Sequence, residues 1–423
     1  MSDTNRPAGS PVFKKYLAFL GPGIAIAATG VGAGDMVTAT VAGSKYGFAV
    51  IWAAVVGALL KGVLNEGLAR WQLATGTTLL EGWVQRLGSW VQLYFLVYLV
   101  LWSFVVGAAL ISACGLAAHA IAPALSVEVW GVLHSLGAVL VVLFGGYQYF
   151  ERLMKLFIGI MFITILGCAF FVASPTAVVT QSISAAAIPA GSAKFILGII
   201  GGVGGSLTLL AYGYWIRERQ WHGSRWKAAV RFDLTVSYVL TGLFGVALMV
   251  LASKILYARG ASIEGSEGVL HMATILSEVI GPIGHWAFLV GFWGAVTTSM
   301  IGVWQGVPYM FCDFVGLMKK LTPQQQEAIV NTRSVWYRGY LFWLAIPPLA
   351  VLLLGRPVWI IVVYSVIGAL FMPFLAATLL YMNSKTEWVG QQLKNGWLTI
   401  SLLVVSLVLF GYLCFAEILK FFK

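Results

Sequence analysis

The sequence predicts an all-α polytopic membrane protein with eleven transmembrane helices. Hydrophobic residues make up 60% of the 423 residues and charged residues only 10%, whereas soluble globular domains carry roughly 25% charged residues. The apolar residues also gather in runs of about 20, the length that spans a bilayer as a helix. These two observations exclude a soluble enzyme and a disordered chain, and the short alternating segments of an outer-membrane barrel are absent.

Polar segments between the apolar runs are short, so a single transmembrane transporter domain is expected over residues 1–423. The predicted spans are 17–43, 47–71, 91–120, 129–147, 153–174, 194–216, 232–255, 282–312, 336–354, 358–381 and 397–419.

The distribution of basic residues predicts the orientation of these spans. With the N-terminus inside and alternating loops, 18 of the 26 Lys and Arg residues fall inside and 7 outside, and Lys61 lies within the second span. Lys and Arg concentrate in cytoplasmic loops. We therefore expect a bacterial-type plasma (inner) membrane protein with a cytoplasmic N-terminus and an external C-terminus. The net charge of +11 reflects this bias, and no nucleic-acid partner is expected.

Glycine clusters interrupt the first and sixth spans at matching places. They fall at residues 29–35 and 201–206, and each glycine weakens a helix by about 1 kcal/mol relative to Ala. Such glycines can also serve close helix packing. Interrupted spans at corresponding positions, however, are typical of transporters built from inverted repeats, where they mark the binding site. The predicted repeats cover about 17–174 and 194–381, with an extra helix at 397–419.

Several motifs resemble the NRAMP family of divalent metal transporters, which have a LeuT-type fold with five plus five inverted-repeat helices. The similar segments are Leu20–Gly23, 42–47, Gly198–Gly201, Gly291–Gln305 and Met372–Phe374. The resemblance covers most of the chain, and it implies a LeuT-type fold with broken helices 1 and 6 and a transporter rather than an enzyme.

The metal-binding motifs of that family do not carry over. The family's D-P-G-N becomes Gly32-Ala33-Gly34-Asp35, and its M-P-H falls at about Gly205-Ser206-Leu207. The third span contains no Asp or Glu, and no histidine lies in spans one or six. Transition metals favour imidazole, thioether or several carboxylates as ligands. These departures predict a divergent branch without a transition-metal site.

Glycine N–H groups at half-helix ends bind anions. The leading hypothesis is therefore Na⁺- or H⁺-coupled uptake of a small anion, with bicarbonate favoured and a small carboxylate nearly as good. The alternative is a divalent cation, Mg²⁺ or Mn²⁺, held by Asp35 and backbone carbonyls; a channel or a sensor is disfavoured, because neither a filter motif nor a signalling domain is present. The predicted substrate-binding residues are Gly32, Gly34, Gly202, Gly204, Gly205 and Ser206.

Asp35 is the predicted binding residue for the coupling cation, together with Thr297 and Thr298. Its other interpretation is a cap on the second half of the first span. Thr29, Thr38 and Tyr212 are predicted to line the permeation path. Apart from the coupling Na⁺ or H⁺, no cofactor and no bound metal are expected. The protein is predicted to act as a monomer in the lipid bilayer.

Overall fold

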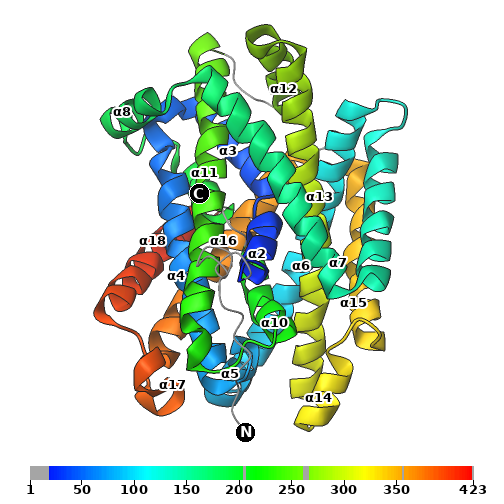
Figure 1. Cartoon of the computed structure of the whole chain (residues 1–423), viewed down its shortest axis with the longest axis vertical. Helices are drawn as coiled ribbons and strands as arrows, with labels where there is room; N and C mark the ends of the chain where they lie inside the picture. Colours follow the sequence, from blue (N-terminus) through cyan, green and yellow to red (C-terminus); the bar gives the residue numbers. More distant parts are fainter. Residues whose placement is uncertain (1–18, 203–205, 261–265, 355–356, 422–423) are drawn as a thin grey trace, which may run out of the picture.

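The computed structural model describes residues 19–202, 206–260, 266–354 and 357–421. These residues form helices and connecting turns, and no strand occurs among them. Most long helices run roughly parallel to one another (Figure 1), with α8 and α12 at one end of the molecule and α5, α14 and α17 at the other. The predicted all-α membrane fold is confirmed.

The first predicted span is two helices, α2 (Pro22–Gly30) and α3 (Ala33–Tyr46), bent by 50° at the break between them. Pro22 begins α2, where its missing N–H group costs nothing. The free N–H groups of Gly21 and Gly23 donate to Asp233 Oδ1 and Oδ2 at 3.2 and 2.7 Å. A carboxylate from another helix therefore fixes the start of α2.

The sixth predicted span begins with α9 (Ala193–Gly202) and continues as η2 (Leu207–Leu210) and α10 (Ala211–Glu218). The first break occurs where its glycine cluster predicts it, and Ser206, at the end of the second cluster, has non-helical backbone angles (φ −123°, ψ −101°) before η2. Residues 203–205, between α9 and η2, lie outside the described residues.

Each remaining predicted span has a helical counterpart. Spans two, three, seven and eight are α4 (Trp52–Thr75), α6 (Ser89–Ile121), α11 (Lys227–Ile255) and α13 (Pro282–Met318). Spans nine to eleven are α15 (Val335–Ala345) with η5 (Pro347–Leu354), α16 (Pro357–Met382) and α18 (Trp397–Phe421).

The fourth and fifth predicted spans are the two helical halves of α7 (Val127–Val172), which meet at a turn at Gly146. Its φ of 64° and ψ of 169° suit glycine because a side chain rarely adopts positive φ. By length and composition, six of the described helices can cross a membrane, or seven with the bent α2–α3 pair. The number eleven therefore stays a prediction.

Short helices connect the spans. They are η1 (Gly47–Val50), α5 (Leu79–Arg86), α8 (Pro175–Ala185), η3 (Ser224–Trp226), η4 (Tyr257–Arg259), α12 (Ser266–Ile280), α14 (Pro323–Ile329) and α17 (Thr386–Leu393).

Small residues allow the broken first span to lie inside the bundle. All nine residues of α2 are buried, and α2 and α3 pack against α11, α13 and α9. A Cβ atom on Gly43 would lie 2.8 Å from the Ala252 Cβ, so glycine is needed for α3 to approach α11 this closely. The α2–α3 break is therefore surrounded by other helices, where irregular backbone is tolerated.

Candidate functional site

The break between α2 and α3 is held by the side chain of Asp35. The N–H group of Val31 donates to Ala27 O at 2.8 Å, which is the last bond of α2. The next N–H group, that of Gly32, donates to Asp35 Oδ2 at 3.2 Å. One carboxylate oxygen of Asp35 therefore accepts a hydrogen bond from Gly32, the residue just before α3, in line with the capping interpretation.

Three buried side-chain oxygens around this break have no hydrogen-bond partner. They are Asp35 Oδ1, Thr29 Oγ1 and Thr38 Oγ1, on residues that are only 3–4% exposed. Most buried polar atoms in proteins are paired, and leaving one unpaired costs about 1–3 kcal/mol. Thr29 Oγ1 lies toward Gly302 of α13, and Asp35 Oδ1 is the carboxylate oxygen among the three.

Of the three neighbouring hydroxyl residues on α13, only some contact the α2–α3 break. Ser299 Oγ donates to Thr29 O at 2.7 Å. Thr298 Oγ1 donates within its own helix, to Gly294 O and Ala295 O, and the buried Thr297 Oγ1 has no hydrogen-bond partner. Ser299 is thus the α13 hydroxyl at the break, and the coupling-ion role of Thr297 and Thr298 stays a prediction.

A buried lysine connects the two broken spans. Lys61 of α4 is fully buried. Its Nζ donates to Gly201 O in the last turn of α9, and it interacts electrostatically with Asp35. Lys61 is not among the residues predicted to form the site. The signal for it was a lysine within the otherwise apolar stretch 52–64, a placement that is costly and usually functional.

The sixth-span residues predicted to bind substrate are only partly described. Gly202 ends α9, and Gly204 and Gly205 lie outside the described residues. Ser206 is buried and its Oγ accepts a hydrogen bond from Trp102 Nε1 at 3.0 Å. On the first span, Gly34 lies buried in α3 one residue before Asp35. The role of all these residues stays a prediction.

The residues predicted to line the permeation path lie on both sides of the α2–α3 break. Thr38 of α3 lies against Gly198 of α9, since a Cβ on that glycine would be 2.7 Å from Thr38 Cγ2. Tyr212 OH donates to Asp233 Oδ2 at 3.1 Å. Because Asp233 also binds the start of α2, Tyr212 links α10 to α11 and α2.

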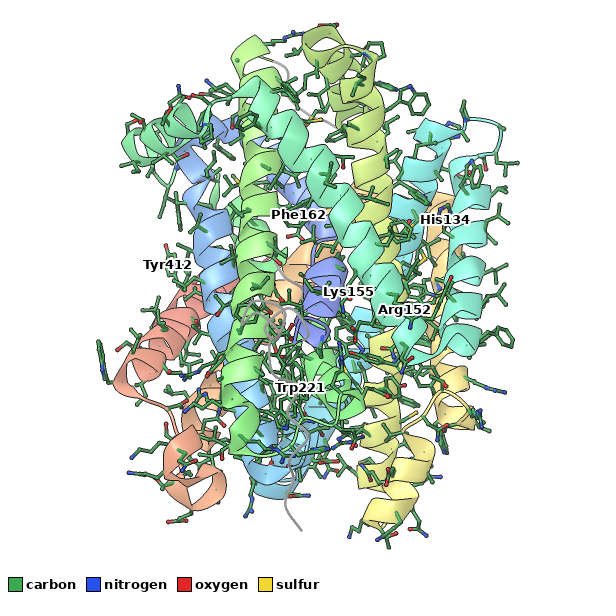
Figure 2. All side chains as sticks on the ribbon, in the orientation of Figure 1. His134, Arg152, Lys155, Phe162, Trp221 and Tyr412 are labelled. Carbon is green, nitrogen blue, oxygen red and sulfur yellow. The ribbon has the colours of Figure 1, made fainter. Side chains whose placement is uncertain are left out.

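An ion-paired cluster fastens the end of α10 to α7. Arg219 Nη2 lies 2.6 Å from Glu151 Oε1, and Lys155 Nζ lies 2.7 Å from the same oxygen. Lys155 and its neighbour Arg152 are labelled on α7 in Figure 2. This end of the molecule also holds the loops that the charge bias predicts to be cytoplasmic.

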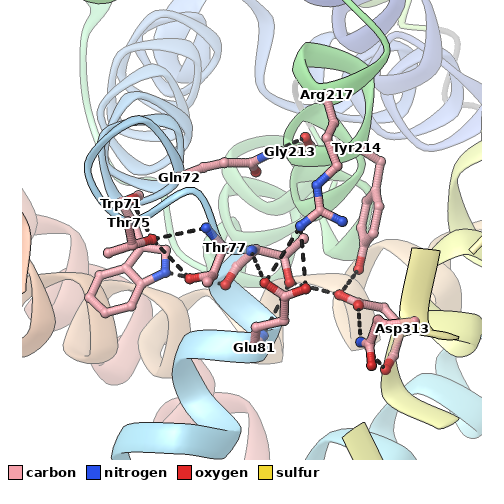
Figure 3. Close-up of polar contacts among 11 residues, drawn as sticks. Trp71, Gln72, Thr75, Thr77, Glu81, Gly213, Tyr214, Arg217 and Asp313 are labelled. Carbon is pink, nitrogen blue, oxygen red and sulfur yellow. Dashed lines mark hydrogen bonds and ion pairs between the residues drawn. The ribbon is translucent and has the colours of Figure 1, made fainter. Parts of the chain in front are cut away.

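A second polar network joins α5, α10, α13 and α14 at the same end (Figure 3). Asp313 of α13 is its centre: Oδ2 accepts hydrogen bonds from Thr78 Oγ1 at 2.7 Å and Tyr214 OH at 2.8 Å. Gln326 Nε2 donates to Asp313 Oδ1 at 2.6 Å. The network therefore holds the second half of the sixth span against the neighbouring helices.

Glu81 and Arg217 extend this network to a cavity of about 590 Å³. Their side chains form an ion pair at 3.3 Å. Burial, together with the nearby Asp313 carboxylate, raises the pKa of Glu81 to about 7, although Arg217 opposes the shift. The cavity is also lined by Tyr214, Glu218 and His222.

A sequence profile described as Nramp, natural resistance-associated macrophage protein-like, matches residues 23–416. The chain belongs to the Nramp family. It is 22% identical over 425 residues to the divalent metal cation transporter MntH of Bacillus subtilis, an alignment that covers 94% of this chain and 92% of that one. The fold is also that of Nramp structures. A point mutant of the manganese transporter of Eremococcus coleocola superposes with a TM-score of 0.76 at 17% identity, covering 98% of this chain and 89% of that one.

Other transporters share the architecture at lower similarity. Mhp1, a nucleobase-cation-symport-1 family transporter, matches with a TM-score of 0.60 at 12% identity, and the match covers 92% of this chain and 91% of that one. The resemblance to Nramp proteins and the LeuT-type fold are therefore confirmed. Nramp proteins are integral membrane transporters rather than enzymes, as expected for this chain.

The predicted anion substrate, bicarbonate or a small carboxylate, is wrong. The matching family and the relatives named divalent metal cation transporters or manganese transporters indicate a metal cation. The physical reason lies in the atoms at the break: the unpaired ones are oxygens, one of them on a carboxylate that repels anions. The glycine N–H groups predicted to bind an anion at 204 and 205 lie outside the described residues.

Proposed function

We propose that this Nramp protein carries a divalent metal cation across the membrane, with Asp35 as its charged ligand. The observation that supports this most is the buried Asp35 Oδ1, a carboxylate oxygen without a hydrogen-bond partner at the break of the first span. A carboxylate oxygen only accepts, so a cation satisfies it. Broken spans are also where transporters of this architecture bind their substrates.

The neighbouring donors complete an all-oxygen set. Thr29 Oγ1 and Thr38 Oγ1 are unpaired on either side of Asp35, and the last carbonyl groups of α2 have no following helical N–H group. In the described residues, no group of three or more His, Cys, Asp or Glu side chains lies close enough to hold a metal. The cation is therefore expected to keep part of its hydration shell.

Oxygen ligands and retained water favour Mg²⁺ or Mn²⁺ over softer metals. Mg²⁺ dehydrates reluctantly and typically binds one or two carboxylates with several waters. Cd²⁺ is softer and gains most from thiolate and thioether sulfur. We infer a preference for Mg²⁺ and Mn²⁺, with Cd²⁺ a weak substrate.

Lys61 balances the charge of Asp35 when no metal is present. An unpaired carboxylate buried inside a protein is strongly destabilising, and Lys61 supplies the opposite charge from α4. An arriving dication takes over this role, and Lys61 keeps its hydrogen bond to Gly201 O. Lys61 therefore lowers the affinity for metal while keeping the empty site stable.

Substrate access requires movement, because Thr29, Asp35 and Thr38 are nearly fully buried. The contacts of Asp233, Asp313 and Glu81 hold α2 and α10 at the end predicted to be cytoplasmic. We infer alternating access in which these contacts break when the site opens to that side. Coupling to Na⁺ or H⁺, the two repeats and the orientation in the membrane stay predictions.

Uptake into liposomes tests the proposal. Purified protein is reconstituted, and the accumulation of Mn²⁺, Mg²⁺, Cd²⁺ and labelled bicarbonate is measured with and without Na⁺ and H⁺ gradients. We expect saturable Mn²⁺ or Mg²⁺ uptake that falls to the level of empty liposomes in Asp35→Asn. The exposed carboxylate variant Glu128→Gln is the control and should transport normally. Bicarbonate uptake without metal uptake, or normal metal uptake by Asp35→Asn, contradicts the proposal.

A further inference from the structure

A long apolar groove runs along the outside of the bundle between α4, α11 and α18. Its volume is about 680 Å³. On α11 it extends from Arg231 to Val246, and on α4 from Glu66 to Val55. Fifteen residues of helix rise about 22 Å, more than the roughly 15 Å depth of one hydrocarbon leaflet. The groove can therefore hold a complete acyl chain.

Close packing of small residues forms the floor of the groove. A Cβ on Gly242 would lie 3.1 Å from the Ala58 Cβ, and one on Gly62 would lie 3.3 Å from the Tyr238 ring. Larger side chains at these two glycines would displace the neighbouring helix or fill the space. Leu398 and Leu402 of α18 line the opposite wall.

Positive charge gathers at one end of this groove. Arg231 Nε donates to Glu66 Oε1 at 2.9 Å, and Arg70 Nε donates to Glu66 Oε2 at 2.6 Å. Lys227, one turn before Arg231, interacts electrostatically with all three residues. Two arginines thus share one carboxylate, and Lys227, whose Nζ donates to Gln392 O of α17, adds a third positive charge beside them. Arg231 is 54% exposed, so its guanidinium is accessible from outside the bundle.

We propose that this groove binds an anionic phospholipid, with one acyl chain along α11 and the headgroup phosphate on Arg231 and Lys227. The excess of positive charge selects an anionic headgroup, and the apolar length selects a lipid over free phosphate. Cationic side chains at the cytoplasmic membrane surface attract anionic lipids, and this is the surface predicted for the start of α11. The floor residue Tyr238 accepts a hydrogen bond from Asn65 Nδ2 at 3.1 Å, one turn from Lys61, so a bound lipid touches the helix that carries Lys61.

Native mass spectrometry of the full-length protein tests the proposal. The protein is released from detergent with added phosphatidylglycerol or with phosphatidylcholine of the same acyl chains. We expect one phosphatidylglycerol molecule to stay bound preferentially and excess inorganic phosphate not to displace it. The double variant Lys227→Gln/Arg231→Gln should lose this preference, by about fivefold for each cation removed. Arg70 still pairs with Glu66 in that variant.

Two further variants separate the groove from general lipid contact. Val239→Trp places a large ring in the groove and should release both lipids, whereas Val97→Trp, on a comparably exposed valine of α6, should not. Arg152→Gln removes an exposed cation from α7, which lies to the right of α4 and α18 in the view of Figures 1 and 2, and should keep the preference. Equal retention of both lipids by the unmodified protein, or unchanged preference in the double variant, overturns the proposal. A dimer mass that Val239→Trp reduces to a monomer also overturns it, because a second copy then fills the groove.

Discussion

The two carboxylate oxygens of Asp35 separate its structural role from the binding role that we propose. Oδ2 accepts the N–H group of Gly32 and fixes the break, while Oδ1 is unpaired. The motif resemblance places the family's aspartate at Gly32, and in this chain a carboxylate occurs three residues later, close to one turn of helix.

Replacing Asp35 with asparagine preserves the bond to Gly32, because the amide oxygen can accept it, but removes the charge. We expect metal affinity to fall at least about 30-fold, since a lost charged contact is worth about 2 kcal/mol. Isothermal titration calorimetry with Mn²⁺ measures this change. Equal affinities for Asp35→Asn and the unmodified protein would mean that Asp35 is only a cap.

Lys61→Met tests the buried counter-charge. Without metal, the variant leaves Asp35 uncompensated, and breaking a buried pair in this way costs about 3–5 kcal/mol. We expect a lower unfolding temperature in metal-free detergent solution. Added Mn²⁺ should raise that temperature more than in the unmodified protein, because the metal replaces the missing charge.

The control for Lys61→Met is Lys155→Met, which removes a half-exposed lysine paired with Glu151. Exposed pairs contribute about 0–1 kcal/mol, so this variant should respond to Mn²⁺ as the unmodified protein does. An equal response of Lys61→Met to Mn²⁺ would exclude Lys61 as the counter-charge of the site.

At the level of elements, the α2–α3 break depends on a close approach to α13. Gly32 has extended backbone angles that any residue adopts. A Cβ atom there, however, would lie 2.6 Å from the Ser299 Cβ. The requirement for glycine at this position is therefore steric, and a smaller residue at position 299 of α13 should remove it.

We expect Gly32→Ala to lower the free energy of unfolding by about 1–3 kcal/mol, as overpacking does, and to reduce transport. The double variant Gly32→Ala/Ser299→Gly should regain most of the lost stability and most of the lost transport. The matched control is Gly32→Ala/Thr298→Gly, since Thr298 bonds within its own helix. Thermal unfolding and uptake measure the outcome, and equal behaviour of the two double variants would refute the steric explanation.

The Glu81–Arg217 pair makes the contact between α5 and α10 sensitive to pH. The pKa of Glu81 is raised from 4.5 to about 7 in the folded protein, chiefly by burial. The folded state therefore binds a proton between pH 4.5 and 7 that the unfolded state releases. The contribution of Glu81 to stability falls as pH rises through this window, by about 3 kcal/mol at most.

Glu81→Gln keeps the cap on Thr78 and has no charge to lose. Compared with the unmodified protein, it should unfold at a similar temperature at pH 5 and at a higher temperature at pH 8. Thermal unfolding at both pH values checks this difference. If the two proteins differ equally at pH 5 and pH 8, Glu81 does not titrate in this range.

At the scale of the whole molecule, apolar length and glycine position predicted the architecture well. The break near Gly32 and the non-helical Ser206 lie within the glycine clusters that interrupt the spans, and the turn at Gly146 lies beside the predicted gap between spans four and five. These features follow from local backbone preference. They therefore need no knowledge of which helices are neighbours.

The composition of the site was harder to predict. Thr297 and Ser299 lie about 200° apart around one helix, and the sequence does not fix which of them faces the break; Ser299 does. The contact between Lys61 and Gly201 joins residues 140 positions apart. The substrate class was wrong because glycine clusters do not determine whether N–H groups or oxygens face the site.

Anomalous X-ray scattering from crystals soaked in Mn²⁺ shows whether Asp35 binds the metal, because it locates the ion without relying on transport. We predict an anomalous peak within coordination distance of Asp35 Oδ1, between α2–α3 and the α9–η2 segment, that is absent from Asp35→Asn crystals. Peaks confined to the carboxylates of the Glu81 and Glu218 cavity, with none at Asp35, would contradict the claim.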